Sequence, residues 1–181
     1  MAPSGNMQAL ISDEYKEIQN AEHADPDYGY ASNFYAELIA AVINECGADK
    51  ILDYGAGKGG LGKALAPHIK RPITVLEYDP AIPSIATPPE PCPLVACIDV
   101  LEHIEPDLLD NVLDDLVRVC SGFFVFTVST TEAIRFLPDG RNAHLIVKPL
   151  EWWLPKFWDR FGLHSFARIT SGFWITGFKK A

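Results

Sequence analysis

The distribution of hydrophobic and polar positions predicts helices and strands that alternate along most of the chain. Apolar side chains keep helical spacing over residues 32–46, which end at a glycine, and over residues 106–120. Further helices are expected at 13–24, 61–68 and 152–161. Short apolar runs predict strands at 50–54, 73–77, 94–98, 123–128, 165–169 and 173–178.

This order of elements predicts an α/β fold, a Rossmann-like and mostly parallel sheet with helices on both faces. Only residues 170–172 separate the last two strands, so the C-terminal edge strand is expected to be antiparallel. The 181 residues suit a single domain, with 1–30 as an N-terminal tail or lid and 31–181 as the Rossmann-like core. Six prolines between 80 and 93 exclude a helix there and predict an extended loop.

A glycine-rich turn follows the first core strand. The pattern is Asp53-x-Gly55-x-Gly57-x-Gly59, and a helix is expected to begin just after it. Glycines permit tight strand-to-helix turns and let the backbone come close to a ligand, so this turn predicts a site for an adenosine-containing cofactor. The spacing differs from the G-x-G-x-x-G fingerprint of dinucleotide sites, which disfavours a nucleotide-binding oxidoreductase.

Two acids lie where the second core strand ends. Glu77 stands 22 residues after Gly55, a distance that suits one strand–helix–strand unit. A carboxylate at this position can accept hydrogen bonds from the hydroxyls of a ribose. Glu77 is the preferred ribose ligand, and Asp79 is the second choice.

A third motif follows the strand expected at 94–98. It reads Asp99-Val100-Leu101-Glu102-His103-Ile104. Together, the three motifs resemble those of the class I S-adenosylmethionine (SAM)-dependent methyltransferases. The run Val100–Ile104 is similar to the V-L-E-H segment of small-molecule enzymes such as the quinone-biosynthesis O-methyltransferases. The resemblance extends from about residue 32 to the C-terminus, and the region 137–153 is also similar to some phage-encoded methyltransferase-like proteins.

The resemblance implies an enzyme that uses SAM. Asp53 would orient the amino group of the cofactor, and the glycine turn would surround its amino-acid end. The cofactor-binding positions expected from the resemblance are Asp53, Gly55, Ala56, Gly57, Glu77, Tyr78, Asp79, Asp99 and Val100. If the acceptor is a hydroxyl that must lose a proton, His103 and His144 are the candidate catalytic bases.

Other side chains are candidates for the acceptor pocket. Arg141 lies beside His144 in a loop after the strand expected at 123–128 and is a candidate for orienting the acceptor. Four aromatic side chains of the N-terminal segment are candidates for lining a lid, and ordinary interface aromatics are the alternative: Tyr15, His23, Tyr28 and Tyr30.

The composition and charge limit the kinds of acceptor that we expect. The net charge is −9 and there is no run of lysines and arginines, which disfavours tight independent binding of nucleic acid. Residues 99–102 do not match the Asp/Asn-Pro-Pro-aromatic motif of amino-directed DNA methyltransferases, and the one Pro-Cys pair precedes the strand that it follows in cytosine-C5 enzymes. We therefore expect a small-molecule or nucleotide-sized acceptor. A non-catalytic SAM-binding or partner-binding protein and another nucleic-acid methyltransferase are the alternatives.

The cysteines and apolar runs bear on location. The four cysteines form neither a C-x-x-C pair nor a zinc-ligand spacing, so no metal site is predicted from them, and they are expected to be reduced thiols. No apolar run approaches the length of a membrane span, and the first residues do not look like a signal peptide. A cytoplasmic protein is expected. The sequence does not indicate an oligomeric state.

Overall fold

The computed structural model describes residues 8–25 and 31–180, with side chains from residue 34 onward in the second segment. Its α-helices are α1 (Asp13–Glu22), α2 (Ala31–Cys46), α3 (Leu61–Leu65), α4 (Leu109–Val119) and α5 (Leu150–Arg160). Its strands are β1 (Lys50–Tyr54), β2 (Thr74–Tyr78), β3 (Cys92–Ile98), β4 (Cys120–Ser129), β5 (Phe161–Ile169) and β6 (Gly172–Lys179). Three short 3-10 helices lie at Pro83–Ile85, Leu101–His103 and Pro106–Leu108.

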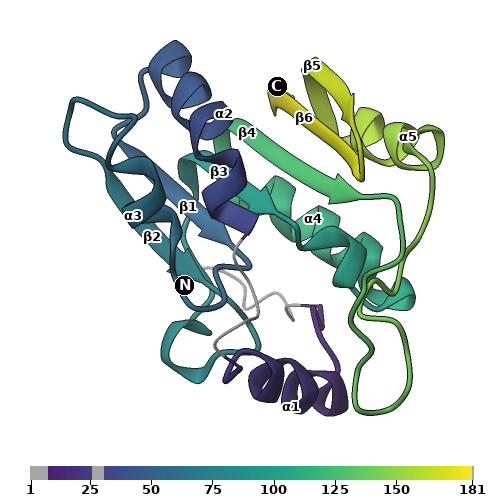
Figure 1. Ribbon diagram of the computed structural model, residues 1–181. Coiled ribbons are helices and arrows are strands. Elements are labelled where there is room, and N and C mark those ends of the chain that lie inside the picture. Colours follow the sequence, from purple (N-terminus) through teal and green to yellow (C-terminus); the bar gives the residue numbers. More distant parts are fainter. Residues whose placement is uncertain (1–7, 26–30, 181) are drawn as a thin grey trace, which may run out of the picture.

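The six strands form one sheet in the order β2-β1-β3-β4-β6-β5 (Figure 1). The first four strands in this order are parallel, and β6 is antiparallel to both β4 and β5. This confirms the predicted fold class. The antiparallel strand lies one place in from the edge, however, and β5 is the edge strand. Most of β6 is buried, whereas exposed positions alternate along β5, so β5 is suited to the edge.

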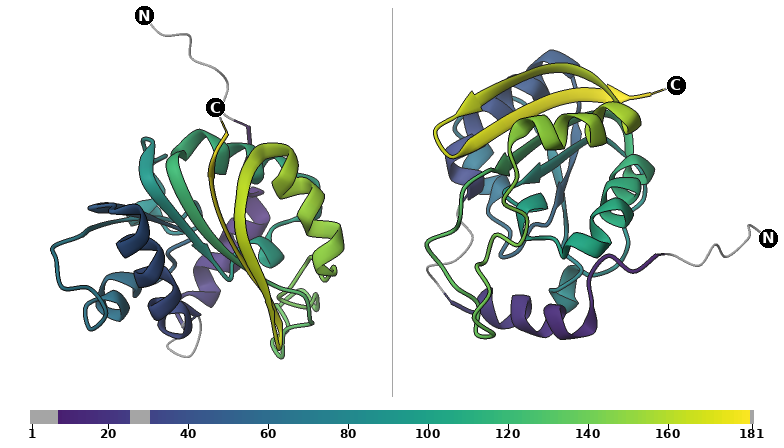
Figure 2. Two further views of the ribbon diagram at one scale, coloured as in Figure 1. Left: turned by 90° about the horizontal axis from the view of Figure 1, so that it is seen from above. Right: turned by 90° about the vertical axis from the view of Figure 1, so that its right-hand side faces the viewer.

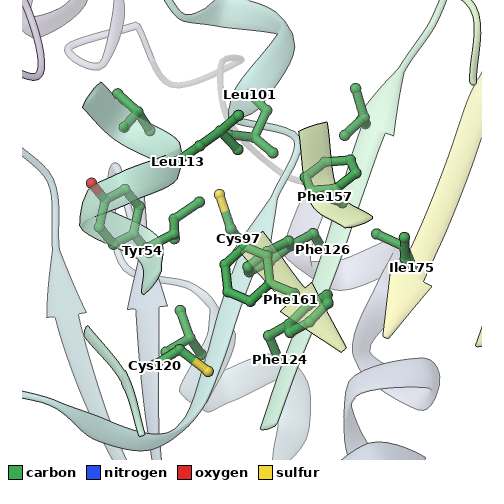
Figure 3. Packing of buried hydrophobic residues seen from close by; sticks show 14 of the residues in the cluster. Tyr54, Cys97, Leu101, Leu113, Cys120, Phe124, Phe126, Phe157, Phe161 and Ile175 are labelled. Carbon is green, nitrogen blue, oxygen red and sulfur yellow. The ribbon is translucent and has the colours of Figure 1, made fainter. Parts of the chain in front are cut away.

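Helices cover both faces of the sheet (Figure 2). Alternate residues of β3 serve the two layers: Leu94 and Ala96 pack with α2 and α3, and Val95 and Cys97 pack with α4 and α5. The α4–α5 side is rich in aromatic rings (Figure 3), including Phe124, Phe126, Phe157 and Phe161. These two layers hold the parallel strands in place, so the carboxyl ends of these strands lie together at one end of the sheet.

The proline-rich segment after β2 is extended, as predicted. Between residues 80 and 91 it contains only the 3-10 turn at Pro83–Ile85, so β2 pairs with β1 alone and forms the other edge of the sheet. This turn still closes onto the strand end, because the Asp79 N–H donates to the Ile85 carbonyl at 3.2 Å.

Helix α1 lies beyond the carboxyl ends of the parallel strands, beside the long connection between β4 and α5 (Figure 1). The Tyr15 ring packs against Leu137 and Ala143 of that connection. The Ser12 hydroxyl donates to the Glu105 carboxylate at 2.7 Å, which anchors the start of the helix. The described part of the predicted tail therefore covers the carboxyl ends of the parallel strands. Residues 1–7 and 26–30 lie outside the described residues. Over the described ranges, no helix combines the length and apolar character that crossing a bilayer requires.

Candidate active site

A cavity of about 840 Å³ opens between the carboxyl ends of β1–β4, helix α1 and the connection 130–146. Its volume is within the range of small-molecule sites, and its position is where open α/β sheets bind ligands. Of the cofactor-binding and catalytic residues expected from the sequence, those that line it are Asp53, Gly55, Ala56, Gly57, Asp79, Asp99, Val100, His103 and His144. Glu77 and Tyr78 do not line it.

The glycine turn adopts backbone angles that side chains other than glycine rarely accept. Gly55, Gly57 and Gly59 have φ of 82°, 51° and 67°. The Gly55 and Ala56 N–H groups both donate to the Tyr78 carbonyl, at 2.8 and 3.0 Å. These two N–H groups are therefore used inside the protein and are not available to a ligand.

Asp79 is the acid that the β2 end presents to the cavity. It is 6% exposed, and its two carboxylate oxygens accept from the Gly57 N–H at 3.0 Å and the Ala81 N–H at 2.8 Å. The exposed Glu77 carboxylate instead lies against Gly59, where it would meet any Cβ added to that glycine. From the sequence, Glu77 was preferred to Asp79 as the ribose ligand. Of these two acids, the structure brings only Asp79 to the cavity wall.

Asp53 is a buried carboxyl group at the end of β1. Burial, followed by the negative charges of Glu77 and Asp79, raises the pKa of Asp53 to about 7. Near neutral pH the group is therefore poised between its protonated and ionised forms. A cation placed beside it would favour the ionised form.

Asp99 follows β3 in an unusual conformation. Its φ of 59° is the only positive φ outside glycine among the described residues. Its N–H donates to the Thr127 hydroxyl on the neighbouring strand at 2.9 Å, which holds the turn to the sheet. The next side chain, Val100, packs against Gly55, where an added Cβ would overlap it. The β3 end and the glycine turn therefore share one wall of the cavity.

The two predicted catalytic histidines, His103 and His144, lie next to each other on the opposite side of the cavity. Their rings lie 4.8 Å apart, centroid to centroid, in an edge-on arrangement. The Nδ1 atom of His103 is 2.8 Å from the Ala143 carbonyl, and that of His144 is 2.6 Å from the Thr131 carbonyl. Because a carbonyl only accepts, each Nδ1 carries the proton in the neutral ring and each Nε2 keeps a lone pair. Burial lowers the pKa of His103 to about 4, so this ring is neutral near pH 7.

Glu102 is a site-forming residue to which the sequence assigned no role. Its side chain is fully buried, and its Oε1 accepts from the Ser129 N–H at the end of β4. Its carbonyl accepts from the Ile146 N–H at 2.9 Å. Burial and the neighbouring Asp99 raise the pKa of Glu102 well above its usual range. The only signal in the sequence was an acid between Leu101 and His103, in a segment otherwise rich in apolar residues.

Helix α1 completes the cavity. The Tyr15 hydroxyl donates to the His103 carbonyl at 2.8 Å and accepts from the Gln19 amide at 2.7 Å. The His23 ring lies over Gly57, with its Nε2 atom 4.0 Å from the Asp79 carboxylate. Tyr15 and His23 thus line the cavity, and a lid role for this segment stays a prediction.

Two other predictions for the acceptor pocket have different outcomes. Arg141 does not line the cavity; it pairs with Asp139 at 2.5 Å. Tyr28 and Tyr30 fall outside the described residues.

Comparison with known proteins bears on this geometry. No family model matches the chain. A stretch of 49 residues is 47% identical to part of a tRNA1(Val) (adenine(37)-N6)-methyltransferase of Shewanella amazonensis, covering 27% of this chain and 21% of that protein. The chain thus spans about a fifth of the length of this curated relative.

Solved structures match over nearly the whole chain. A 1,6-didemethyltoxoflavin-N1-methyltransferase of Burkholderia thailandensis, with bound 1,6-didemethyltoxoflavin and S-adenosylhomocysteine (SAH), superposes with a TM-score of 0.68 at 15% identity, covering 99% of this chain and 94% of that chain. The chain has the class I methyltransferase fold. A magnesium protoporphyrin IX methyltransferase of Synechocystis PCC 6803 with bound SAM shares this methyltransferase fold with a TM-score of 0.60 at 12% identity, covering 96% of this chain and all of that one.

Proposed function

We propose that this protein is a SAM-dependent methyltransferase that acts on a small-molecule acceptor. The observation that carries the proposal is the cavity at the carboxyl ends of the sheet, with Asp53, the glycine turn and Asp79 on one wall and two histidines on the other. The shared fold supports it, since structures of that fold contain bound SAM or SAH.

The residues fit this cofactor. Asp53 is a buried carboxyl group whose raised pKa would return toward its usual range beside a cation, and the cofactor's amino-acid end carries an ammonium group. Asp79, fixed by two backbone N–H groups, is our candidate for the ribose hydroxyls in place of Glu77. Asp99 and Val100 are proposed to contact the methionine part.

SAM supplies a methyl group that is already activated, so the protein has to orient the acceptor and exclude water. Helix α1 lines the cavity on the side away from the sheet. If the acceptor is a hydroxyl, its proton must also be removed. The low pKa of His103 makes this ring a weak proton acceptor near pH 7, so we assign that role to His144 in the metal-free protein.

The lining favours a small acceptor with apolar surface. Leu10, Ile11, Ile104 and Ile134 contribute apolar side chains to the cavity. The net charge of −9 does not suit a long anionic acceptor. The local similarity to a tRNA methyltransferase keeps an adenine acceptor as the second candidate, although residues 99–102 do not match the amino-methylation motif.

We further propose a cytoplasmic location. All four cysteines are free thiols, and none is arranged in a disulfide. Free thiols of this kind are usual in a reducing compartment.

The first experiment is calorimetric titration with SAM, SAH and NAD. Asp79→Asn is the test variant and Glu77→Gln is the matched control, since both replace a carboxylate by an amide near the end of β2. Loss of a charge-assisted hydrogen bond costs about 1.5–3 kcal/mol, so affinity for SAM should fall roughly 10- to 100-fold in Asp79→Asn. Glu77→Gln should stay within about twofold of the parent protein.

The outcomes separate the hypotheses. Binding of SAM and SAH with the expected loss in Asp79→Asn justifies a screen of small hydroxyl- and amine-bearing acceptors, with methyl transfer followed by mass spectrometry. If neither SAM compound binds, the proposed function is refuted, and binding of NAD alone would indicate an oxidoreductase. If SAM binds but no acceptor is methylated, including a tRNA pool, a non-catalytic SAM-binding protein becomes the better description.

A further inference from the structure

Asp99 and His103, four residues apart in one segment, come together with His144, which lies 41 residues after His103. Asp99 follows β3, His103 ends a 3-10 turn, and His144 belongs to the connection between β4 and α5. One possible ligand atom from each lies within 4.8 Å of the others, and all three residues line the cavity. Two imidazoles and one carboxylate are a ligand set that first-row transition metals favour and that Mg²⁺ and Ca²⁺ do not.

We propose that these three side chains form a binding site for a divalent transition-metal ion, of which Zn²⁺ and Co²⁺ are suitable probes. Nothing in the comparisons assigns a metal to this protein. The sequence could not indicate the complete site by spacing, since His144 lies far along the chain from Asp99 and His103.

The histidines are held in the manner of metal ligands. Metal-bound imidazoles commonly donate their other ring N–H to a carbonyl or carboxylate, which fixes the tautomer and directs the second nitrogen at the metal. His103 and His144 each place Nδ1 against a backbone carbonyl, at 2.8 and 2.6 Å, so Nε2 is the nitrogen that would bind. The edge-on rings, with an interplanar angle of 84°, bring these two separately anchored side chains to one place.

The third ligand is positioned by the backbone. Asp99 is the one described non-glycine residue with a positive φ, and its N–H is anchored on the Thr127 hydroxyl of β4. Such a conformation is seldom adopted without a local reason. Here it places a carboxylate near two imidazoles.

The spacing requires only a small adjustment. Ligand atoms at about 2.1 Å from a tetrahedral zinc are roughly 3.4 Å apart, so the present separation of up to 4.8 Å would have to shrink by about 1.4 Å. A three-residue site leaves at least one coordination position for water or an acceptor atom, as in catalytic zinc sites.

The chemical use of the metal rests on the proposed function, but the binding of the metal does not. An acceptor hydroxyl bound to the ion would lose its proton to solvent more readily, since a cation stabilises the oxyanion. In the metal-bound protein His144 would then be a ligand, and the ion would replace the histidine in activating the acceptor.

The test is a titration of the untagged protein with Zn²⁺ by calorimetry and with Co²⁺ by visible absorption, without cofactor. We expect one ion per chain, Co²⁺ bands typical of nitrogen and oxygen ligands, and little heat with Mg²⁺. His144→Ala and Asp99→Asn should each weaken Zn²⁺ binding by more than the roughly 10- to 100-fold that loss of an outer-shell partner costs. His164→Ala is the matched control, because His164 is exposed on β5 and pairs with Glu45.

Thermal unfolding of each variant shows whether it is folded before the titration is interpreted. Absence of stoichiometric Zn²⁺ binding, or equal binding by the parent protein and folded His144→Ala, would overturn the proposal. Thiolate-to-cobalt bands would also overturn it, since they would place the ion on a cysteine. The SAM titration is separate, so failure of the metal site and failure of the proposed function give different results.

Discussion

Asp53 should make the cofactor-free protein less stable at neutral pH than it would be with a neutral side chain. The pKa of this carboxyl group is about 7 in the folded protein and about 3.8 as an ordinary reference. The difference corresponds to about 4 kcal/mol of unfolding free energy. The ionised form of the Asp53 carboxyl group has a lower free energy in the unfolded chain than in the folded protein. Burial and the charges of Glu77 and Asp79 oppose its ionisation in the folded protein.

The sign of the pH dependence follows from this raised pKa. Below about pH 4 the group is protonated in both states, so it contributes no penalty. Between about pH 4 and pH 7 the unfolded chain releases this proton and the folded protein retains it, so stability falls as the pH rises. Above pH 7 both states are ionised and the penalty is constant.

Asp53→Asn keeps the shape of the side chain and removes the charge. Measured by urea unfolding without cofactor, the variant should be more stable than the parent protein by up to about 4 kcal/mol at pH 8. At pH 5 this gain in stability should be smaller by roughly 2–3 kcal/mol. The same variant should bind SAM at least about tenfold more weakly, since its amide cannot pair with an ammonium group. A destabilised variant at pH 8, or a stability difference that does not change with pH, would refute the reasoning.

Two further predictions concern the glycine turn and the core. Gly57→Ala should lower Tm by roughly 2–8 °C, because φ is 51° and the added Cβ would lie 2.5 Å from the His23 ring; thermal unfolding checks this, and full recovery on adding His23→Ala would contradict a backbone origin. Phe126→Ala should cost about 3–5 kcal/mol in urea unfolding, because this ring is fully buried against the aromatic layer. Phe166→Ala, at a side chain 49% exposed on β5, is the control, and an equal loss there would show that burial does not decide the effect.

The fold was largely accessible from the sequence because its signals are local. Short apolar runs predicted the strands, helical spacing predicted α2 and α4, and the prolines of 80–93 excluded a helix. The placement of β6 inside the sheet was not accessible, because strand order depends on which side chains are buried on both faces. The sequence could show a hairpin but not which of its strands faces solvent.

At the site, the sequence by itself determined the residue types and the segments that carry them: the turn at 53–59, the acids around the end of β2, and the segment 99–104. Only the tertiary structure decided which of these side chains reach the cavity. Asp79 reaches it because two backbone N–H groups hold its carboxylate there, and Glu77 lies outside over Gly59.

The meeting of Asp99, His103 and His144 was likewise decided by the fold. A loop 40 residues after His103 returns to it, and the carbonyl of Ala143 anchors the His103 ring. No local pattern encodes such a contact, because its stability comes from burial and hydrogen bonds between segments that are distant in the chain. The sequence determined which chemical groups this protein has, and the packing of the connection against the strand ends determined which of them can act together.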